Sequence, residues 1–552
     1  MAKKSNCKYI FVVGGVISGV GKGITSSSLG LILKNRGLNV TAIKIDPYVN
    51  VDAGTMNPTE HGEVFVLGDG DETDQDMGNY ERFLDINLTR INYMTTGRVY
   101  QTVIEKERNL EYKGKNVEVV PDIPLEVIRR IKNAQENSKA DVVMIEIGGT
   151  VGEYQNMLFL EAGRMMKIES PADVFFVMVS YLPTPFNIGE MKTKPTQHAV
   201  RTLNASGIQP DFLIARGATS LDDKRKEKIS LLCNFLPDRI IAAPDVDSIY
   251  DIPLNFEKEK LSDKLCKIMD VICKAPDKSA WDAWKSFAKH AHNGKEVVRI
   301  AMIGKYFETG DFILSDSYLS VIEALKYSAY AENRKPVISW LNSVDYEKNP
   351  ASLKELKKYD GIVVPGGFGA RGVEGNLQVV KFARENKIPY FGLCYGMQMM
   401  VIEYARNVLG LRDANTREVN PNAKNIVIDV MESQKEHLQN NRYGGSMRLG
   451  AYKAQLREGT IARNAYEQKE IIERHRHRYE VNPAFVADLE AKGLVFSGRS
   501  PEGHLMEIAE LPKSKHPFFL GTQFHPEFLA HPLHPHPLFT AFIKACVKQN
   551  KK

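Results

Sequence analysis

Short apolar runs rich in β-branched residues recur along the first half of the chain, and helical patterns separate them. The runs that predict buried strands are 8–13, 39–45, 141–147, 173–180 and 211–216. A helical pattern over 24–36 ends at Gly37. Strands that alternate with helices predict a parallel sheet whose ligands bind at the carboxyl ends of the strands.

A second series of the same kind begins at Val297. Apolar runs at 297–303, 361–364 and 389–391 predict strands, and 397–406 predicts a helix. Between the two series, Ala275-Pro276-Asp277 interrupts the pattern before an amphipathic stretch at 281–292. We therefore expect an α/β protein with two doubly wound domains, at 1–272 and 297–552, joined by a linker at 273–296.

Composition limits the classes of function. Of 552 residues, 43 % are hydrophobic and 26 % charged, which is ordinary for a globular protein. No apolar run approaches the ~18 residues of a membrane span and no cleavage-like leader is seen, so we expect a cytoplasmic protein. The net charge of +5 is spread along the chain and favours small phosphorylated ligands over nucleic acid. The six cysteines include no CxxC pair, so we expect neither a disulfide nor structural zinc.

A glycine-rich segment, GGVISGVGKG, follows the first predicted strand and opens the first predicted helix. In this order, backbone N–H groups and a helix N-terminus bind polyphosphate while Lys22 reaches the outer phosphates. The segment departs from GxxxxGK[ST] because Gly23 replaces the hydroxyl residue. From local sequence alone, a tight turn without a ligand explains it equally well.

Charged residues follow other predicted strands at the end where ligands are expected. Lys44 and Asp46 end the second strand, and Glu146 ends the third. Glu146, together with Asp74 and Asp76 of an acidic loop, could hold Mg²⁺ beside the phosphates. The segment 192–198, KTKPTQH, precedes a helical pattern and has the composition of a second anion site, although a charged helix entrance without a ligand is equally compatible.

The strongest catalytic motif is Gly392-Leu393-Cys394-Tyr395-Gly396. An apolar run precedes it and a helical pattern follows, which is the arrangement of a nucleophile elbow with cysteine in place of serine. The helix N-terminus would favour the thiolate, and His525, oriented by Glu527, would take the proton. An isolated cysteine is more often a buried core residue. The elbow spacing and the downstream Phe524-His525-Pro526-Glu527 favour catalysis instead.

The second domain resembles a class I glutamine amidotransferase, which has a flavodoxin-like fold, a Cys-His-Glu triad and a glycine-rich oxyanion segment, here 365–369. Such a domain releases ammonia from glutamine through a thioester. Over nearly its whole length, about Tyr9 to Phe539, the chain resembles the CTP synthase family. The motifs that carry this resemblance are GGVISGVGKG, KIDPYVNVDAGTMNP, HGEVFVLGDGDETDQDMGNYERF, EIGGTVG, KTKPTQH, DVDSIY, PGGFGARGVEG, ERHRHRYEVN and QFHPE.

The family resemblance implies ATP-dependent conversion of UTP to CTP, with ammonia from L-glutamine and a 4-phosphorylated UTP intermediate, in pyrimidine biosynthesis. It implies a synthetase domain with a phosphate-loop-like parallel sheet before the amidotransferase domain. It also implies Mg²⁺ as the metal, GTP as activator, CTP as product inhibitor and a homotetramer, with filament formation left open. The two joined domains make physical sense because ammonia must reach the uracil site unprotonated and shielded from water.

The resemblance also implies roles for individual residues. Cys394, His525 and Glu527 would be catalytic. ATP would contact Gly19, Val20, Gly21, Lys22, Gly23, Ile24, Lys44, Asp76, Arg216, Asp245 and Val246, with Asp76 and Glu146 holding Mg²⁺. UTP or CTP would contact Ser18, Glu153, Tyr154, Gln155, Lys192, Thr193, Lys194, Pro195, Thr196, Gln197 and Lys228. Glutamine would contact Gly367, Tyr395, Gly396, Met397, Gln398, Glu418 and Arg478, and His61 would lie at the ammonia passage.

Two places depart from the family pattern. Tyr395 stands where many members have Leu. Glu153-Tyr154-Gln155-Asn156 replaces Asp-Ile-Glu-Ser in a turn that, in the family, contacts the nucleotide sugar and the CTP base. Because Gln155 would exchange a charge-assisted hydrogen bond for a neutral one, we expect weaker CTP inhibition than is usual.

Two other functions are weighed against this one. Another glutamine-dependent synthetase, such as a GMP synthetase or a cofactor amidase, would lack KTKPTQH and DPYVNVDAGTMNP. A non-enzymatic filament protein or nucleotide sensor would require a damaged triad or phosphate loop, whereas Cys394, His525, Glu527, Lys22 and Glu146 are all present.

Overall fold

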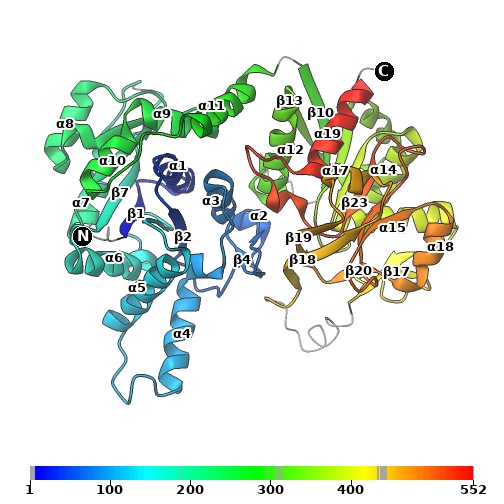
Figure 1. Ribbon diagram of the computed structural model, residues 1–552, viewed down its shortest axis with the longest axis horizontal. Coiled ribbons are helices and arrows are strands. Elements are labelled where there is room, and N and C mark those ends of the chain that lie inside the picture. Colours follow the sequence, from blue (N-terminus) through cyan, green and yellow to red (C-terminus); the bar gives the residue numbers. More distant parts are fainter. Residues whose placement is uncertain are drawn as a thin grey trace. The chain divides into compact units, whose positions relative to one another are not determined.

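The computed structural model describes residues 7–187, 189–294, 296–304, 308–309, 312–313, 315–431, 434 and 444–550. The chain forms two compact units (Figure 1). Unit 1 consists of Met1–Asp52 and Asp76–Ala288, and unit 2 of Ala53–Gln75 and Lys289–Lys552.

Unit 1 is built on a parallel sheet, as predicted. Among the described residues the strand order is β5-β2-β6-β1-β7-β8-β9, and every adjacent pair is parallel. The inner strands are buried on both faces, which explains why they are continuous apolar runs. The strands are β1 (Lys8–Gly15), β2 (Val40–Asp46), β5 (Tyr93–Thr95), β6 (Val142–Ile147), β7 (Val174–Tyr181), β8 (Phe212–Gly217) and β9 (Ile240–Pro244).

Helices cover both faces of this sheet (Figure 1). Phe11 and Val13 of β1 share one core with Val127 of α5 and Phe159 of α6. Helix α1 lies on the other face, where Leu29 and the residues near it are buried. The helices are α1 (Lys22–Lys34), α3 (Asp76–Leu84), α4 (Thr96–Arg108), α5 (Val119–Ser138), α6 (Met157–Glu169), α7 (Lys194–Ala205), α8 (Asp223–Cys233), α9 (Ile252–Lys258), α10 (Leu261–Met269) and α11 (Lys278–Asn293), the last of which ends in unit 2.

The expectation that the chain has no disulfide is wrong. Cys266 of α10 and Cys273 are bonded, with their Cα atoms 6.2 Å apart. Helix α10 ends at Met269, and Asp270 takes a left-handed conformation with φ 50°, which reverses the chain and returns Cys273 to Cys266. A cysteine count and a search for CxxC spacing cannot detect such a reversal. Cys394 is a free thiol.

Unit 2 contains a mixed sheet with the order β13-β10-β14-β15-β23-β22-β21-β18-β19 within the described part of the chain. The strands from β13 to β23 are parallel, and those from β23 to β19 are antiparallel. These strands are β10 (Glu296–Gly304), β13 (Arg334–Asn342), β14 (Gly361–Val364), β15 (Tyr390–Leu393), β18 (Arg448–Leu456), β19 (Glu470–His477), β21 (Val495–Arg499), β22 (Met506–Glu510) and β23 (Phe519–Thr522).

Smaller elements complete unit 2. Short strands outside the main sheet are β11 (Glu308–Thr309), β12 (Phe312–Ile313), β16 (Asn415–Thr416), β17 (Ile426–Val430) and β20 (Tyr479–Val481). The helices are α12 (Leu319–Ala331), α13 (Ser343–Lys348), α14 (Val373–Asn386), α15 (Tyr395–Tyr404), α17 (Ile461–Tyr466), α18 (Val486–Ala491) and α19 (Pro537–Asn550).

The segment Ala53–Gln75 folds with unit 2 although it interrupts the sequence of unit 1. It contains α2 (Pro58–His61), β3 (Phe65–Val66) and β4 (Glu72–Thr73). Nη1 of Arg474 donates to the Val66 carbonyl at 3.1 Å, and Nε of Arg476 donates to Glu72 Oε1 at 2.8 Å. Two arginines on the same face of β19 therefore attach this segment to the rest of unit 2.

Candidate active sites

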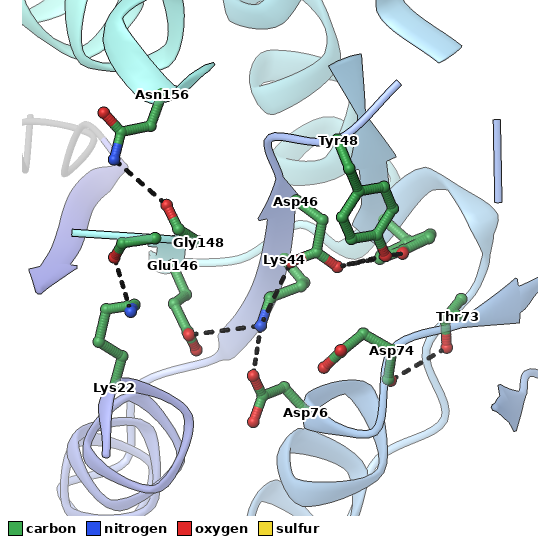
Figure 2. A network of polar contacts seen from close by, with 12 residues as sticks. Lys22, Lys44, Asp46, Tyr48, Thr73, Asp74, Asp76, Glu146, Gly148 and Asn156 are labelled. Atoms are coloured by element: carbon green, nitrogen blue, oxygen red, sulfur yellow. Dashed lines mark hydrogen bonds and ion pairs between the residues drawn. The ribbon is translucent and has the colours of Figure 1, made fainter. Parts of the chain in front are cut away.

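The phosphate loop of unit 1 turns sharply between β1 and α1. Val16 and Gly19 have φ of 79° and 68°, and Gly21, with φ 89°, precedes the first helical residue. A β-branched residue in the left-handed region is strained, and such strain concentrates at ligand-binding loops. Nζ of Lys22 donates to the Gly149 carbonyl at 2.8 Å (Figure 2). The loop thus has the backbone form that turns successive N–H groups toward an anion.

The structure explains why glycine stands at position 23, where the usual phosphate-loop pattern has serine or threonine. A Cβ atom at this position would collide with the carboxylate of Asp76. A serine or threonine there would displace the carboxylate of Asp76, which lies at the start of α3. The departure noted in the sequence therefore accommodates an acid at the site.

Three carboxylates surround the ammonium of Lys44 (Figure 2). Nζ lies 3.5 Å from Asp46 Oδ1 and 3.4 Å from Glu146 Oε1, and it also contacts Asp76 closely. Burial raises the pKa of Glu146 to about 7, with Lys44 opposing the rise. Burial also acts to raise the pKa of Asp76, but the charge and hydrogen bond of Lys44 outweigh it and hold that pKa below its usual range.

This donor set fits Mg²⁺. Asp76 and Glu146 converge on one cationic group, which is the placement that two carboxylates need to share a metal ion. Within the described residues no group of three or more His, Cys, Asp or Glu could hold a metal by itself. Mg²⁺ is usually held by one or two carboxylates with water and substrate phosphates, so the two findings agree.

A cavity beside the phosphate loop brings several predicted ATP contacts together. Its lining includes Gly21, Ile24, Thr25, Arg216, Ala243, Pro244, Asp245, Val246, Ile249, Ile252, Asn255 and Phe256. Nη1 of Arg216 donates to the Val20 carbonyl at 3.1 Å and Nη2 to Asp245 Oδ1 at 2.5 Å. Sequence reasoning missed the apolar wall of Ile249, Ile252 and Phe256, although Ile249 belongs to the motif DVDSIY.

The predicted UTP and CTP contacts line neither this cavity nor the one described below. Glu153 Oε1 accepts from the N–H of Thr150 at 2.8 Å, and Gln155 Nε2 donates to Glu153 Oε2 at 2.8 Å. Tyr154 is 91 % exposed. The turn at 153–156 is therefore ordered by hydrogen bonds of its own side chains.

Further along the chain, Thr196 is buried and hydrogen-bonded to Ser180 at 2.9 Å. Exposed or half-buried members of the predicted set are Ser18, Lys192, Lys194, Pro195, Gln197 and Lys228.

The cysteine elbow of unit 2 joins β15 to α15. Cys394 has φ 47° and ψ −95°, and its N–H donates to the Thr522 carbonyl at 2.6 Å. A Cβ on Gly392 would lie 2.6 Å from the carbonyl carbon of Gly396, and a Cβ on Gly396 would collide with the Val364 carbonyl. Both glycines are thus required for the chain to turn this tightly, as the elbow motif predicts.

The predicted triad partners meet at this elbow. His525 Nδ1 lies 2.7 Å from Glu527 Oε1, and both side chains are buried. Burial alone would lower the pKa of His525, but the Glu527 carboxylate and the Cys394 sulfur raise it to about 10. His525 Nε2 is buried without a hydrogen-bond partner among the described residues, so a proton there is available to a substrate.

A cavity opens beside the triad. It is lined by Pro58, Glu63, Val64, Ser317, Tyr318, Gly366, Gly367, Phe368, Cys394, Arg476, His525, Glu527 and Phe528. The first three come from Ala53–Gln75, so a segment distant in sequence forms part of the wall. Glu63 accepts from the Ser320 N–H at 3.1 Å and so caps helix α12. In this segment, sequence reasoning predicted His61 at the ammonia passage and Asp74 as a possible Mg²⁺ ligand, but none of the three wall residues, for which the motif HGEVF was the available signal.

Other predicted glutamine contacts do not line the cavity. They are Tyr395, Gly396, Met397, Gln398, Glu418 and Arg478, and the exposed His61 is also absent from its wall. Glu418 Oε1 accepts from the Gly369 N–H at 2.7 Å, which ties it to the oxyanion segment. Arg478 Nη2 donates to Ser446 Oγ at 3.1 Å.

Comparisons with known proteins agree with this arrangement. The family model described as CTP synthase N-terminus matches residues 8–271, and the one described as glutamine amidotransferase class-I matches residues 313–545. A CTP synthase of Carboxydothermus hydrogenoformans is 49 % identical over 99 % of this chain and 99 % of its own length. One of Sulfolobus acidocaldarius is 48 % identical over 97 % and 99 %.

A solved structure, the glutaminase domain of Trypanosoma brucei CTPS with bound acivicin, is 37 % identical, with a TM-score of 0.42, over 46 % of this chain and 94 % of that one. No described helix is long and apolar enough to cross a membrane. Both family models match, and the two relatives are almost half identical to this chain over nearly its whole length. The chain therefore belongs to the CTP synthase family and catalyses glutamine-dependent amination of UTP to CTP.

Proposed function

We propose that the triad of unit 2 makes ammonia and the charged loop of unit 1 activates UTP to receive it. Sγ of Cys394 would attack the carboxamide carbon of glutamine, and the proton on His525 would go to the departing ammonia. Water would then hydrolyse the thioester, with His525 as base and Glu527 holding the imidazole. The observation that carries this proposal is the pairing of His525 and Glu527 at the cysteine elbow.

In unit 1, the 4-oxygen of uracil would attack the γ-phosphorus of ATP, the bond from that phosphorus to the β–γ bridging oxygen would break, and ADP would leave. Lys22 and Lys44 would stabilise charge on the transferred group. Ammonia would then add to C4, and phosphate would depart. Asp76 and Glu146 would hold Mg²⁺, which supplies charge neutralisation on the phosphates when bound. His61 would lie along the route of ammonia.

The ligands would divide among the predicted residues as follows. The adenine of ATP would occupy the cavity beside Arg216, Asp245 and Val246, and residues 19–24 would wrap its phosphates. UTP, and CTP in its place, would contact the turn at 153–155 and the segment 192–197, with Ser18 and Lys228. Glutamine would be held near Gly367 and residues 395–398, with Glu418 and Arg478 pairing its charged ends.

Regulation belongs to the same proposal. GTP would be the activator, as the resemblance to the family implies. CTP would inhibit more weakly than is usual for the family. Gln155 is neutral and donates to Glu153, and Tyr154 adds an exposed ring to the turn. CTP inhibition measured on the wild type and on a variant with Asp-Ile-Glu-Ser at 153–156 tests this, and equal sensitivity would contradict it.

The active species is proposed to be a cytoplasmic homotetramer. Helices α4 and α5 and the chain between them expose apolar side chains that self-association would bury. They are Ile104, Leu110, Val119, Val120 and Leu125. Light scattering should show a smaller species for Ile104→Asp than for Ile168→Asp, an exposed control on α6. A monomeric wild type would contradict the proposal.

One assay tests the central chemistry. The protein is incubated with UTP, ATP and Mg²⁺ and either glutamine or ammonium, and the nucleotides are resolved by chromatography. CTP should appear with both nitrogen sources. If CTP formed with ammonium but not with glutamine, the proposed role of the triad would be contradicted.

A further inference from the structure

Gln523 lies beside the nucleophile and has no role in the chemistry described so far. It follows β23, two residues before His525, and is 1 % exposed. Its Nε2 donates to Cys394 Sγ at 3.5 Å. The preceding residue contacts the same cysteine, because the Thr522 carbonyl accepts the Cys394 N–H at 2.6 Å. One peptide thus holds the backbone of the nucleophile and touches its sulfur.

The other end of the Gln523 amide is also engaged. Its Oε1 accepts from Gln398 Nε2 at 3.3 Å. The same Nε2 donates to the Tyr479 carbonyl at 3.0 Å, and that carbonyl also lies 3.0 Å from His477 Nδ1. All these groups are buried or partly buried, so the hydrogen bonds form one continuous chain from β20 to the sulfur.

This chain determines which atom of Gln523 faces the sulfur. A backbone carbonyl can only accept, so the Tyr479 oxygen requires the NH₂ group of Gln398. That NH₂ group in turn requires the oxygen of Gln523. The NH₂ group of Gln523 is then left to face Sγ. The orientation of an amide is inferred from its network, and here every link requires the same answer.

We propose that Gln523 is a further functional residue of the glutaminase centre, which stabilises the Cys394 thiolate by direct N–H donation and fixes the position of its sulfur. A sulfur anion accepts a stronger hydrogen bond than a neutral thiol, so the donor favours the reactive form. The same donor stabilises the thiolate again when it leaves the thioester. In the structure the thiol hydrogen can go to the Arg476 carbonyl, 3.8 Å from Sγ, while Gln523 donates from another side.

The test is the alkylation of Cys394 in the full-length protein by iodoacetamide, followed from pH 5 to pH 9 by mass spectrometry of the peptide that contains it. Gln523→Met keeps the shape and removes the donor. Gln523→Glu keeps the shape and places a carboxylate oxygen against the sulfur. The control is Asn376→Leu, because Asn376 is equally buried in unit 2 but donates to the Gly372 carbonyl.

At pH 7, alkylation should slow about tenfold in Gln523→Met and about a hundredfold in Gln523→Glu, with the half-maximal pH moved upward. The kcat of the glutamine-dependent reaction should fall by similar factors, with KM for glutamine within about twofold and ammonia-dependent CTP formation unchanged. Asn376→Leu should alkylate like the wild type.

Three results would overturn the proposal. Wild-type alkylation profiles in both folded variants would mean that Gln523 only fills space. An increase in KM with unchanged kcat would assign it to substrate binding instead. Equal slowing in Asn376→Leu would indicate general loosening of unit 2. If Gln523→Met does not fold, the nearly isosteric Gln523→Glu provides the test by itself. Alkylation reports on Cys394 directly, so its result does not depend on CTP synthesis.

Discussion

The phosphate loop of unit 1 and the cysteine elbow of unit 2 both join a buried parallel strand to a helix. Each forces a residue with a side chain into the left-handed region, Val16 with φ 79° and Cys394 with φ 47°. Their surroundings differ. Residues 17–19 are exposed, and nearby charges pair with one another, whereas Cys394 is buried and its sulfur lies among hydrogen-bonding groups of the protein.

The difference follows from the two reactions. Phosphoryl transfer depends on charge stabilisation, and much of that charge arrives with the ligand, so unit 1 keeps an exposed loop with the buried lysines Lys22 and Lys44 near it. Thiol attack needs one proton moved and one sulfur oriented, so unit 2 fixes these groups before the substrate binds. In unit 1, the single ammonium of Lys44 contacts three carboxylates, so it balances only part of their charge.

The largest expected effect separates the two centres. Cys394→Ala should lower glutamine-dependent CTP formation by about 10³-fold or more, because no other group can form the thioester. Ammonia-dependent formation should persist, since unit 1 is unchanged. Both rates are measured by nucleotide chromatography. Loss of both activities in a folded protein would break the comparison.

Unlike Cys394→Ala, Lys22→Ala should lower CTP formation from both nitrogen sources. Removing a cation that faces the phosphate loop should lower both activities by about 10² to 10³-fold, because either nitrogen source needs activated UTP. Glutamine hydrolysis and alkylation of Cys394 give an independent readout of unit 2. Ammonia-dependent CTP formation at the wild-type rate would show that the loop is not the phosphate site.

Gly23→Ser would restore the usual phosphate-loop pattern, yet it should be harmful. The added atoms would displace Asp76, so both activities should fall on the order of 10 to 100-fold, with a higher Mg²⁺ requirement. Gly68→Ser is the matched control, because a Cβ at Gly68 meets nothing within 4 Å. Improved activity in Gly23→Ser would refute the assignment of Asp76.

The smallest expected effect is on stability and concerns a buried histidine of unit 2. Burial lowers the pKa of His516 to about 4, with its hydrogen bonds to Ala383 and Phe518 opposing the change. As the pH falls, His516 binds a proton near pH 6.5 in the unfolded chain but only near pH 4 in the folded protein. The free energy of unfolding therefore decreases as the pH falls from about 6.5 toward 4. His516→Asn should remove about 2 kcal/mol of the loss between pH 7 and pH 5.

Urea unfolding at the two pH values, followed by a probe in unit 2, measures that difference. His504→Asn is the control, since His504 is exposed. The slope with pH is the readout, because His516→Asn also changes packing at pH 7. An unchanged slope would show that this histidine does not set the acid limit of unit 2.

Local sequence was sufficient wherever neighbouring residues decide the structure. The strands that carry Lys44 and Glu146, and the strand that precedes Cys394, were predicted within one or two residues, because apolar runs and glycine-rich turns are local signals. The pairing of His525 with Glu527 was predicted for the same reason, as they lie two residues apart. Family membership also followed from contiguous motifs.

Contacts between distant residues were decided by the tertiary structure. The reason for Gly23 lies in the carboxylate of Asp76, which occupies the space that a larger side chain would need. Ala53–Gln75 falls within the predicted first domain, whereas it folds with unit 2, where Arg474 and Arg476 donate to it. The Cys266–Cys273 bond depended on one left-handed residue. The donor from Gln523 to Sγ depended on hydrogen bonds that link Gln523, after β23, to Gln398 of α15 and the Tyr479 carbonyl of β20. Periodicity and spacing report only on residues near in sequence, whereas these contacts form when separate elements pack and their buried polar groups must find partners.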